Sequence, residues 1–330
     1  MYEQFFGLQA RPFELTPNPR YLLLTKRHRE ALSNLEYGIG SRRSLTVLTG
    51  DAGTGKTTLI RRALGQLTAA RPDRRGVYLM ISNPTLSRSE FIEAMANALQ
   101  LSPQAAASKA RFLLELERTL LDLRRTDTPV ALIVDEAQSL PAELLEEIRL
   151  LANVETDTEK LLPVVLAGQP ELADRLNEPG LRQLKQRVAL RCSLAPLDLA
   201  ETASYIATRI SIAGGTAAHV FTREAVRAIY DRSRGIPRLI NVLCENALVT
   251  AFAMGRKPVG DDIVAEVGAD FDLHPETSNM SSVTRFEDTP AAGQESAEAP
   301  GAPSEPEVAR RGIFGLSAAA SPSRRWSLLR

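Results

Sequence analysis

A glycine-rich segment with one lysine and three threonines, GDAGTGKTT at positions 50–58, has the residue types of a phosphate-binding loop. It fits the pattern G-x-x-x-x-G-K-[ST]. Its glycines let the backbone curl tightly enough that successive N–H groups and the N-terminus of a following helix face phosphate oxygens. An apolar segment at 44–49 precedes the loop, and a helix-like segment at 57–69 follows it. The candidate nucleotide-binding residues are Gly50, Asp51, Ala52, Gly53, Thr54, Gly55, Lys56, Thr57 and Thr58.

Three side chains of the loop have separate expected roles. Lys56 would reach the β- and γ-phosphates of a bound nucleotide, and Thr57 would place its hydroxyl on Mg²⁺. Thr58 is expected to support the phosphate end of the same helix turn. The alternative interpretation is a glycine turn that only joins a strand to a helix.

Two adjacent carboxylates, Asp135 and Glu136, follow the apolar segment at 130–134. In a parallel sheet, ligands bind at the carboxyl ends of the strands, so both side chains are expected near the phosphate loop. Asp135 would hold Mg²⁺ through water. Glu136 would then be free to accept a proton from an attacking water, which is the role of a general base.

Three further polar residues are weaker candidates. Gln169 directly follows the apolar segment at 162–168, where it could orient the water or touch the γ-phosphate. Arg187 precedes the apolar segment at 188–194 and could enter a neighbouring subunit's nucleotide site. Arg238 follows Gly235 and Pro237 at a helix start, and its guanidinium could reach back to the phosphates. Each could equally be a solvated surface side chain, and the competitors of Arg187 in its stretch are Arg182, Lys185 and Arg191.

The composition predicts a folded enzyme without a bulk charge. Of its 330 residues 44% are hydrophobic, and 40 Lys and Arg balance 40 Asp and Glu, so no general positive field attracts nucleic acid or anionic lipid. Cys192 and Cys244 match no metal or redox spacing and are expected to be small buried side chains. There is no signal-peptide pattern and no apolar run of the roughly 18 residues that span a bilayer. The expected location is the cytoplasm, with peripheral association at the inner membrane as the alternative.

Strand-like and helix-like segments alternate over the first two thirds of the chain. This alternation predicts an α/β fold, a parallel sheet sandwiched by helices. Ser87 and Glu90 have the spacing of a capping box, and Pro141 stands at a helix start. The expected strands are 44–49, 76–81, 130–134, 162–167 and 188–194, and the expected helices between them are 57–69, 87–99, 111–125 and 142–153.

The pattern changes after Pro196. Helix starts at Asp198, Thr222 and Asp261 and a helical segment at 238–254, without a strong strand among them, predict a small all-α domain. From Pro275 the chain is poor in large apolar residues, and a disordered C-terminal tail is expected. The end of the tail could instead touch a partner or a membrane surface, because it interleaves basic and apolar residues: Arg310, Arg311, Ile313, Phe314, Arg324, Arg325, Trp326, Leu328, Leu329 and Arg330.

A series of short strings, in order along residues 1–270, carries a family resemblance. The strings are MYEQFFGL at 1–8, Pro12-Phe13, LTPNP at 15–19, HREAL at 28–32, Tyr37-Gly38, the phosphate loop, DEAQ at 135–138, AGQPEL at 167–172, QR at 186–187 and GIPRLIN at 235–241. Together they resemble the AAA+ superfamily and, within it, the ATPases named after general secretion pathway protein A. The loop motifs specify only an NTPase, whereas MYEQFFGL and GQPEL narrow the choice to this family.

The resemblance implies a P-loop ATPase that works as a homo-oligomer with ATP and Mg²⁺. It assigns Gln169 as the first sensor, Arg187 as a finger acting in a neighbouring subunit, and Arg238 as the second sensor. Relatives serve secretion pores, pili, exopolysaccharide or protein-sorting systems, and a related branch targets transposons. Because no membrane-spanning helix or peptidoglycan-binding domain is recognised, the chain looks like the short, soluble forms associated with exopolysaccharide and exosortase systems.

We therefore expect three parts: a nucleotide domain at 1–196 that includes an N-terminal family segment at 1–43, a helical lid at 197–272, and a tail at 273–330. The expected role is an energy-coupling or assembly ATPase of envelope secretion or exopolysaccharide export. Two alternatives stay open, an ATP-dependent DNA-binding regulator of the transposon-targeting type and a slow nucleotide switch that recruits a partner. DNA is the less favoured partner because the net charge is balanced. His28 and His219 are expected to play no catalytic role.

Overall fold

The computed structural model describes residues 1–16, 21, 23–70, 73, 76–82 and 86–274, which all lie in one compact unit. The predicted tail from Pro275 onward lies outside these residues. Within the described ranges, no helix is long and apolar enough to cross a membrane.

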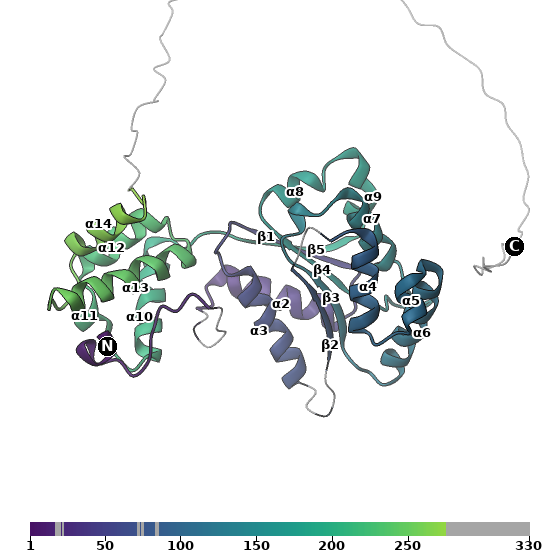
Figure 1. The fold of residues 1–330 in the computed structure, drawn as a ribbon, viewed down its shortest axis with the longest axis horizontal. Helices are drawn as coiled ribbons and strands as arrows, with labels where there is room; N and C mark the ends of the chain where they lie inside the picture. Colours follow the sequence, from purple (N-terminus) through teal and green to yellow (C-terminus); the bar gives the residue numbers. More distant parts are fainter. Residues whose placement is uncertain (17–20, 22, 71–72, 74–75, 83–85, 275–330) are drawn as a thin grey trace, which may run out of the picture. The chain divides into compact units, whose positions relative to one another are not determined.

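Five strands form one parallel sheet in the order β2-β3-β4-β1-β5 (Figure 1). Each predicted strand is present within one or two residues of its expected ends. The predicted α/β class, with helices on both sides of a parallel sheet, is confirmed. The strands are β1 (Leu45–Gly50), β2 (Val77–Ile81), β3 (Val130–Val134), β4 (Val164–Gly168) and β5 (Val188–Leu194).

Alternate side chains of the central strands face two separate cores. In β3, Leu132 packs on one face in a core with α4–α9, whereas Ile133 packs on the other face in a core with α2 and α3. Because both faces are covered, all five residues of β3 are buried. The flanking helices are α2 (Lys26–Gly40), α3 (Lys56–Ala69), α4 (Arg88–Ala98), α5 (Pro103–Ala107), α6 (Lys109–Arg125), α7 (Ala142–Leu151), α8 (Glu171–Arg175) and α9 (Arg182–Lys185).

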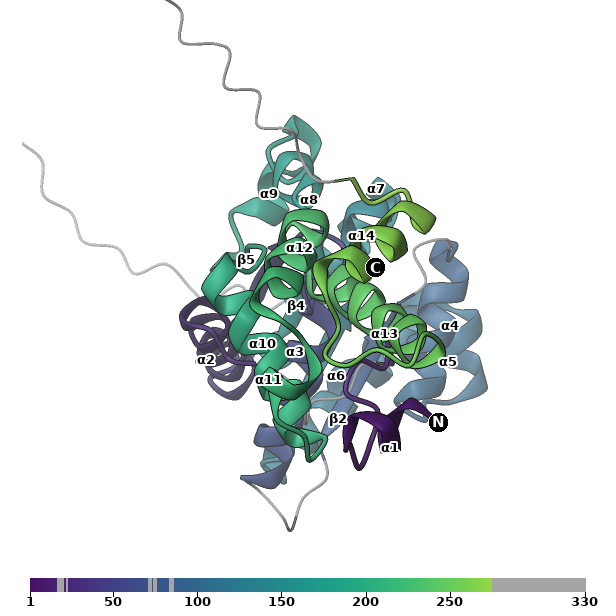
Figure 2. The same cartoon turned by 90° about the vertical axis from the view of Figure 1, so that its left-hand side faces the viewer.

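After β5, the described residues up to 274 form helices and one isolated bridge between Phe221 and Val259, and no further strand joins the sheet, as the sequence predicts. In Figure 2 these helices face the viewer. They share a third core that contains Ile206, Ile229, Leu243 and Val264. They are α10 (Leu199–Ile212), α11 (Ala217–Val220), α12 (Arg223–Ser233), α13 (Pro237–Ala253) and α14 (Asp261–Asp270).

Side-chain hydrogen bonds define the predicted helix starts. Ser87 with Glu90, and Asp198 with Glu201, form reciprocal capping boxes at α4 and α10. Thr222 accepts a hydrogen bond from the backbone N–H of Ala225 at the start of α12. These caps fix the point at which the chain enters the helical domain.

The N-terminal segment packs on two different domains. Helix α1 (Tyr2–Phe6) lies against α13, and the buried Phe6 and Phe13 belong to the core of the helical domain (Figure 1). Helix α2, which the sequence patterns do not identify, packs instead with α3 against the sheet. The assignment of all of 1–43 to the nucleotide domain therefore does not describe the packing of residues 2–13, and the other domain boundaries stay predictions.

Candidate functional site

The phosphate loop joins the end of β1 to the start of α3. Gly53 and Gly55 have φ angles of 85° and 99°, a backbone region that only glycine adopts readily. A Cβ atom on Gly50 would lie 2.6 Å from the carbonyl oxygen of Leu194 on the neighbouring β5. Glycine is thus required both to turn the loop and to seat it against the sheet.

Lys56, the first residue of α3, lies beneath this loop with 5% of its surface exposed. Its Nζ donates hydrogen bonds to the carbonyl oxygens of Gly50 at 2.7 Å and Asp51 at 3.1 Å. Burial lowers the pKa of Lys56, and the negative charges of Glu136 and Asp135 oppose that shift. The ammonium group is therefore held in the curve of the loop, where phosphate would replace the carbonyl contacts.

Thr57 and Asp135 meet next to the loop, as expected of a shared Mg²⁺ site. The Thr57 hydroxyl donates to Asp135 Oδ2 at 2.6 Å, and the backbone N–H of Glu136 donates to Asp135 Oδ1 at 3.0 Å. No cluster of three or more His, Cys, Asp or Glu side chains that could hold a metal is found among the described residues. One carboxylate and one hydroxyl fit Mg²⁺, which usually keeps several waters and binds with substrate phosphates rather than in an all-protein cage.

Glu136 has a left-handed backbone conformation, with φ of 53°, between β3 and a 3₁₀ turn at Ala137–Ser139. Its Oε2 accepts a hydrogen bond from Gln138 Nε2 at 2.7 Å and a longer one from Gln169 Nε2 at 3.5 Å. Gln169 follows β4, the strand next to β3. Glu136 and Gln169 therefore lie at one edge of the sheet, and their catalytic roles stay predictions.

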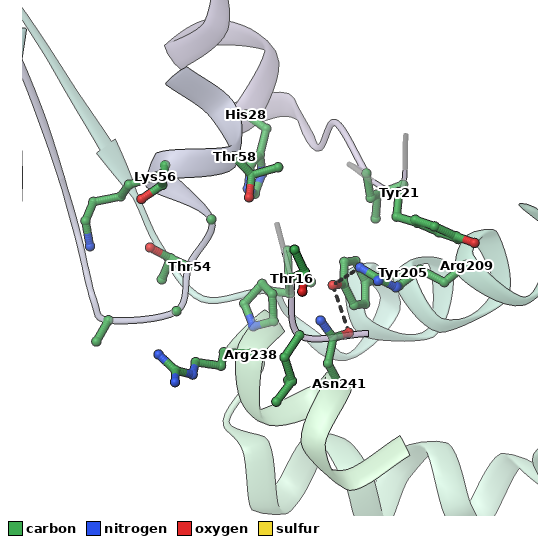
Figure 3. A pocket seen from close by; sticks show the side chains of 18 of the residues that line it. Thr16, Tyr21, His28, Thr54, Lys56, Thr58, Tyr205, Arg209, Arg238 and Asn241 are labelled. Atoms are coloured by element: carbon green, nitrogen blue, oxygen red, sulfur yellow. Dashed lines mark hydrogen bonds between the residues drawn. The ribbon is translucent and has the colours of Figure 1, made fainter. Parts of the chain in front are cut away.

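A cavity of about 370 Å³ opens over the loop. Residues 52–58 and Glu136 line one part of it, and Arg238 at the start of α13 lines another. Figure 3 shows that Thr16, Tyr21 and His28, together with side chains of the helical domain, complete the wall. The space therefore extends from the phosphate loop to a second region formed by parts of the chain distant in sequence.

Residues 39–176, which contain the loop, Asp135 and Glu136, match the AAA domain family. This segment is an AAA domain. General secretion pathway protein A of Aeromonas hydrophila is 43% identical over 265 residues, which are 80% of this chain and 47% of that protein. The resemblance predicted from the sequence is confirmed. The chain spans about half the length of this relative.

Solved structures share the fold at low identity. The Aeropyrum pernix ORC2 protein, solved as ADPNP-ADP complexes, has a TM-score of 0.61 and 18% identity and matches 80% of this chain and 72% of that one. Drosophila ORC bound to DNA has a TM-score of 0.59 and 22% identity, covering 80% of this chain and 65% of that one. These likenesses extend from the AAA domain into the helical domain.

Arg238 connects the helical domain to the loop of the AAA domain. Its backbone N–H donates to the carbonyl oxygen of Gly53 at 3.2 Å, and a Cβ atom on Gly53 would lie 2.6 Å from the Arg238 Cβ. The Arg238 side chain is exposed and lines the cavity (Figure 3). The start of α13 therefore lies beside the loop, and the second-sensor role of Arg238 stays a prediction.

Arg187, in contrast, does not line the cavity of its own chain. It lies between α9 and β5, and its buried Nε has no hydrogen-bond partner among the residues that the structure describes. Glu136 and Arg238 thus line the cavity over the loop and Gln169 contacts Glu136, whereas Arg187 lines no part of this cavity.

Sequence reasoning missed the polar group at the other end of the cavity. Arg209 is 6% exposed; its Nη1 donates to the Tyr205 hydroxyl at 2.8 Å, and that hydroxyl donates to Asn241 Oδ1 at 3.0 Å (Figure 3). The Arg209 guanidinium also lies 4.7 Å from the centre of the Tyr21 ring. Tyr205 and Arg209 are four residues apart on α10, so the sequence could have indicated that their side chains meet. No local pattern predicts the contact between Arg209 and Tyr21.

His28 is also a lining residue that the sequence analysis set aside. It is 4% exposed, and its Nδ1 lies 2.8 Å from the Thr25 hydroxyl at the start of α2. Burial lowers the pKa of His28. A buried imidazole with a hydrogen-bond partner indicates a positioning role in the wall of the cavity.

Proposed function

We propose that this chain binds ATP with Mg²⁺ and hydrolyses it to ADP and phosphate. The observation that carries the proposal is the convergence of the Lys56 ammonium, the Thr57–Asp135 pair and the Glu136 carboxylate around one cavity. The loop N–H groups and Lys56 would bind the phosphates. Thr57 and Asp135 would hold Mg²⁺, which supplies stabilisation of the phosphate charge when bound.

Glu136 is the proposed general base. Its carboxylate would accept a proton from the water that attacks the γ-phosphorus, while the bond from that phosphorus to the ADP oxygen breaks. The contact of Gln169 with the same carboxylate supports a role in orienting that water. Arg238 would bring the helical domain against the phosphates, a role supported by its contact with Gly53.

A second subunit is proposed to complete the site. Within the described part of the chain, the Arg187 guanidinium does not line its own cavity and its buried Nε has no hydrogen-bond partner. An arginine that enters the neighbouring site would stabilise charge that develops during transfer. We therefore expect a homo-oligomer with nucleotide at the subunit boundary.

The cellular role that we propose is energy coupling or assembly for envelope secretion or exopolysaccharide export. The name of the Aeromonas relative and its 43% identity support a secretion role, although this chain spans only about half of that protein. The alternatives are an ATP-dependent DNA-binding regulator and a slow nucleotide switch. Equal numbers of acidic and basic residues favour a protein partner over DNA.

The chemistry is tested by measuring phosphate release at increasing Mg²⁺ concentration. Asp135→Asn should lower turnover by roughly two orders of magnitude, since several kcal/mol of charge stabilisation depend on the metal that Asp135 helps to hold. Asp122→Asn is the matched control, because Asp122 is exposed on α6 and pairs only with its neighbour Arg125. Equal turnover of wild type and Asp135→Asn at limiting Mg²⁺ would exclude this metal site.

The cellular role is tested separately. Cells that lack this chain should retain viability but lose an exported polymer or secreted protein, and Lys56→Ala should not restore export. ATP-dependent retention of duplex DNA by the purified protein, with export intact in the deletion strain, would favour the DNA-binding alternative.

A further inference from the structure

Gln138 has no role in the function proposed above. Its side chain contacts the residues that follow two neighbouring strands, β3 and β4. Its Nε2 donates to Glu136 Oε2 at 2.7 Å. Its Oε1 accepts the backbone N–H of Gln169 at 3.0 Å. One side-chain amide thus joins the carboxylate after β3 to the backbone after β4.

The chemistry of the two partners fixes the orientation of this amide. A carboxylate without a proton only accepts hydrogen bonds, and a backbone N–H only donates them. Turning the Gln138 amide by 180° would place its oxygen against Glu136 and its NH₂ group against the N–H of Gln169. Both contacts would then be repulsive, so only one orientation satisfies both partners.

Neighbouring groups hold the turn that carries Gln138. Arg175, on α8, donates to the carbonyl oxygens of Gln138 at 2.5 Å and Leu140 at 2.7 Å. At Gly168, the last residue of β4, a Cβ atom would lie 2.7 Å from Gln138 Oε1. Glycine at this position therefore leaves the space that the amide occupies.

We propose that Gln138 is a positioning residue that couples the base, Glu136, to the end of β4. This role rests on the proposed hydrolytic function. The amide holds the carboxylate at the cavity wall and ties its position to the backbone of Gln169, so that displacement of either residue moves the other. Because Gln138 does not itself line the cavity, its loss should affect turnover and leave ATP binding largely unchanged.

The test is Gln138→Glu, which keeps the shape of the side chain and the oxygen that accepts the Gln169 N–H. It replaces the donor that faces Glu136 by an acceptor. We expect turnover to fall roughly 10- to 100-fold at pH 8, as for loss of a hydrogen bond to a charged group, with ATP affinity within about twofold of wild type.

Two comparisons separate positioning from packing. Gln138→Met fills similar space without either hydrogen bond, so it should also lose turnover if the amide positions Glu136 and should turn over normally if the side chain only fills space. Gln104→Glu makes the same charge change at an exposed site on α5 and should match wild type. The other charged groups around Lys56 and Glu136, namely Asp51, Asp135 and Glu171, are the same in every variant.

Thermal unfolding without nucleotide measures the contact independently of turnover. Gln138→Glu should lower Tm at pH 8, because its carboxylate then faces the carboxylate of Glu136. Combining it with Glu136→Gln places an amide donor opposite the new carboxylate, and Tm should recover although activity should not. Failure of Tm to recover in the double variant would show that the contact is absent and overturn the inference.

The kinetic outcomes distinguish the two proposals. If wild type does not hydrolyse ATP, or if Glu136→Gln hydrolyses it normally, the proposed function fails and the positioning role fails with it. If Glu136→Gln is inactive while Gln138→Glu turns over normally at pH 8, only the positioning role is overturned.

Discussion

At the scale of single residues, Lys56 has two partners that a nucleotide would displace. Its Nζ bonds the carbonyl oxygens of Gly50 and Asp51, so the ammonium group stays inside the loop even though burial disfavours its charge. Phosphate oxygens would give it stronger, charge-assisted contacts at the same place. The carbonyl oxygens of the loop therefore hold the Lys56 ammonium group where it could bind a phosphate.

We expect Lys56→Ala to abolish detectable ATP binding in a calorimetric titration while the protein stays folded by circular dichroism. The physical reason is the loss of the only loop side chain that carries a positive charge to the phosphates. Lys26→Ala, at an exposed position on α2, is the control and should bind as wild type does. Unchanged ATP affinity of Lys56→Ala would show that Lys56 does not bind the phosphates of ATP.

The sequence alone identifies the local parts of the site but not the contacts across the fold. The loop and the Asp135–Glu136 pair are contiguous motifs, so their residue types and spacing suffice. Gln138 lies two residues from Glu136, yet its other partner, Gln169, becomes a neighbour only because β3 and β4 are adjacent. No local sequence pattern predicts that β3 and β4 are neighbours in the sheet.

At the scale of elements, the strands and most of the longer helices follow from periodicity and caps. The capping boxes at Ser87 and Asp198 begin α4 and α10 where the sequence predicts. Helix α2 was missed, although Thr25 caps it and Leu32, Leu35 and Ile39 repeat at helical spacing on its buried face. The packing of residues 2–13 on the helical domain could not be predicted, because hydrophobic side chains do not specify which core they enter.

The turn between α12 and α13 provides a test of close packing at the base of the helical domain. Gly235 has φ of 72°, and a Cβ atom there would lie 1.8 Å from the Leu197 carbonyl oxygen. Gly255 has φ of 65° but open space around it. In urea unfolding, Gly255→Ala should cost about 1–2 kcal/mol from its left-handed conformation alone.

Gly235→Ala should cost more than Gly255→Ala by at least ~2 kcal/mol, because the backbone of the segment between β5 and α10 must also move. It should weaken ATP binding as well, since the displaced turn carries Arg238 next to the loop. Equal losses of stability for the two variants would mean that Gly235 is not closely packed against Leu197.

His28, at the start of α2, should make the free energy of unfolding depend on pH. Its pKa is lowered by burial from the ordinary value of 6.5, so below pH 6.5 the unfolded chain takes up a proton that the folded chain resists. The unfolded state then binds more protons, and stability must fall as pH falls. The slope from this one group can approach ~1.4 kcal/mol per pH unit.

We therefore expect the unfolding free energy of wild type to decrease more steeply than that of His28→Gln between pH 6.5 and 5. His219→Gln, at an exposed position on α11, should keep the wild-type slope. Parallel slopes for wild type and His28→Gln would show that the imidazole takes up its proton as easily in the folded chain as in the unfolded one.

At the scale of the whole molecule, the proposed role of Arg187 requires a second copy of the chain. Arg187→Ala should keep most of its ATP affinity and lose turnover by roughly 10²-fold or more, because the finger stabilises charge that develops in transfer. Wild-type turnover per subunit should rise with protein concentration as the subunits assemble.

The same defect should be repaired in mixtures. Arg187→Ala supplies an intact base and Glu136→Gln supplies an intact finger, so an interface that combines them can recover partial activity. Hydrolysis is measured across mixing ratios under conditions that allow subunits to exchange. Turnover that is independent of concentration, with no recovery in any mixture, would show that Arg187 does not act in a neighbouring site and would favour the slow-switch alternative.

The most direct test of the central claim is a comparison of ATP binding and single-turnover cleavage in wild type and Glu136→Gln. We expect Glu136→Gln to bind ATP with near wild-type affinity. It should cleave ATP about 10²- to 10⁴-fold more slowly, because this is the usual contribution of a positioned general base. Bound nucleotide recovered from the variant should be ATP, whereas wild type should yield ADP. Cleavage by Glu136→Gln at the wild-type rate would contradict the assignment of Glu136 as the base that makes this cavity an ATP-hydrolysing site.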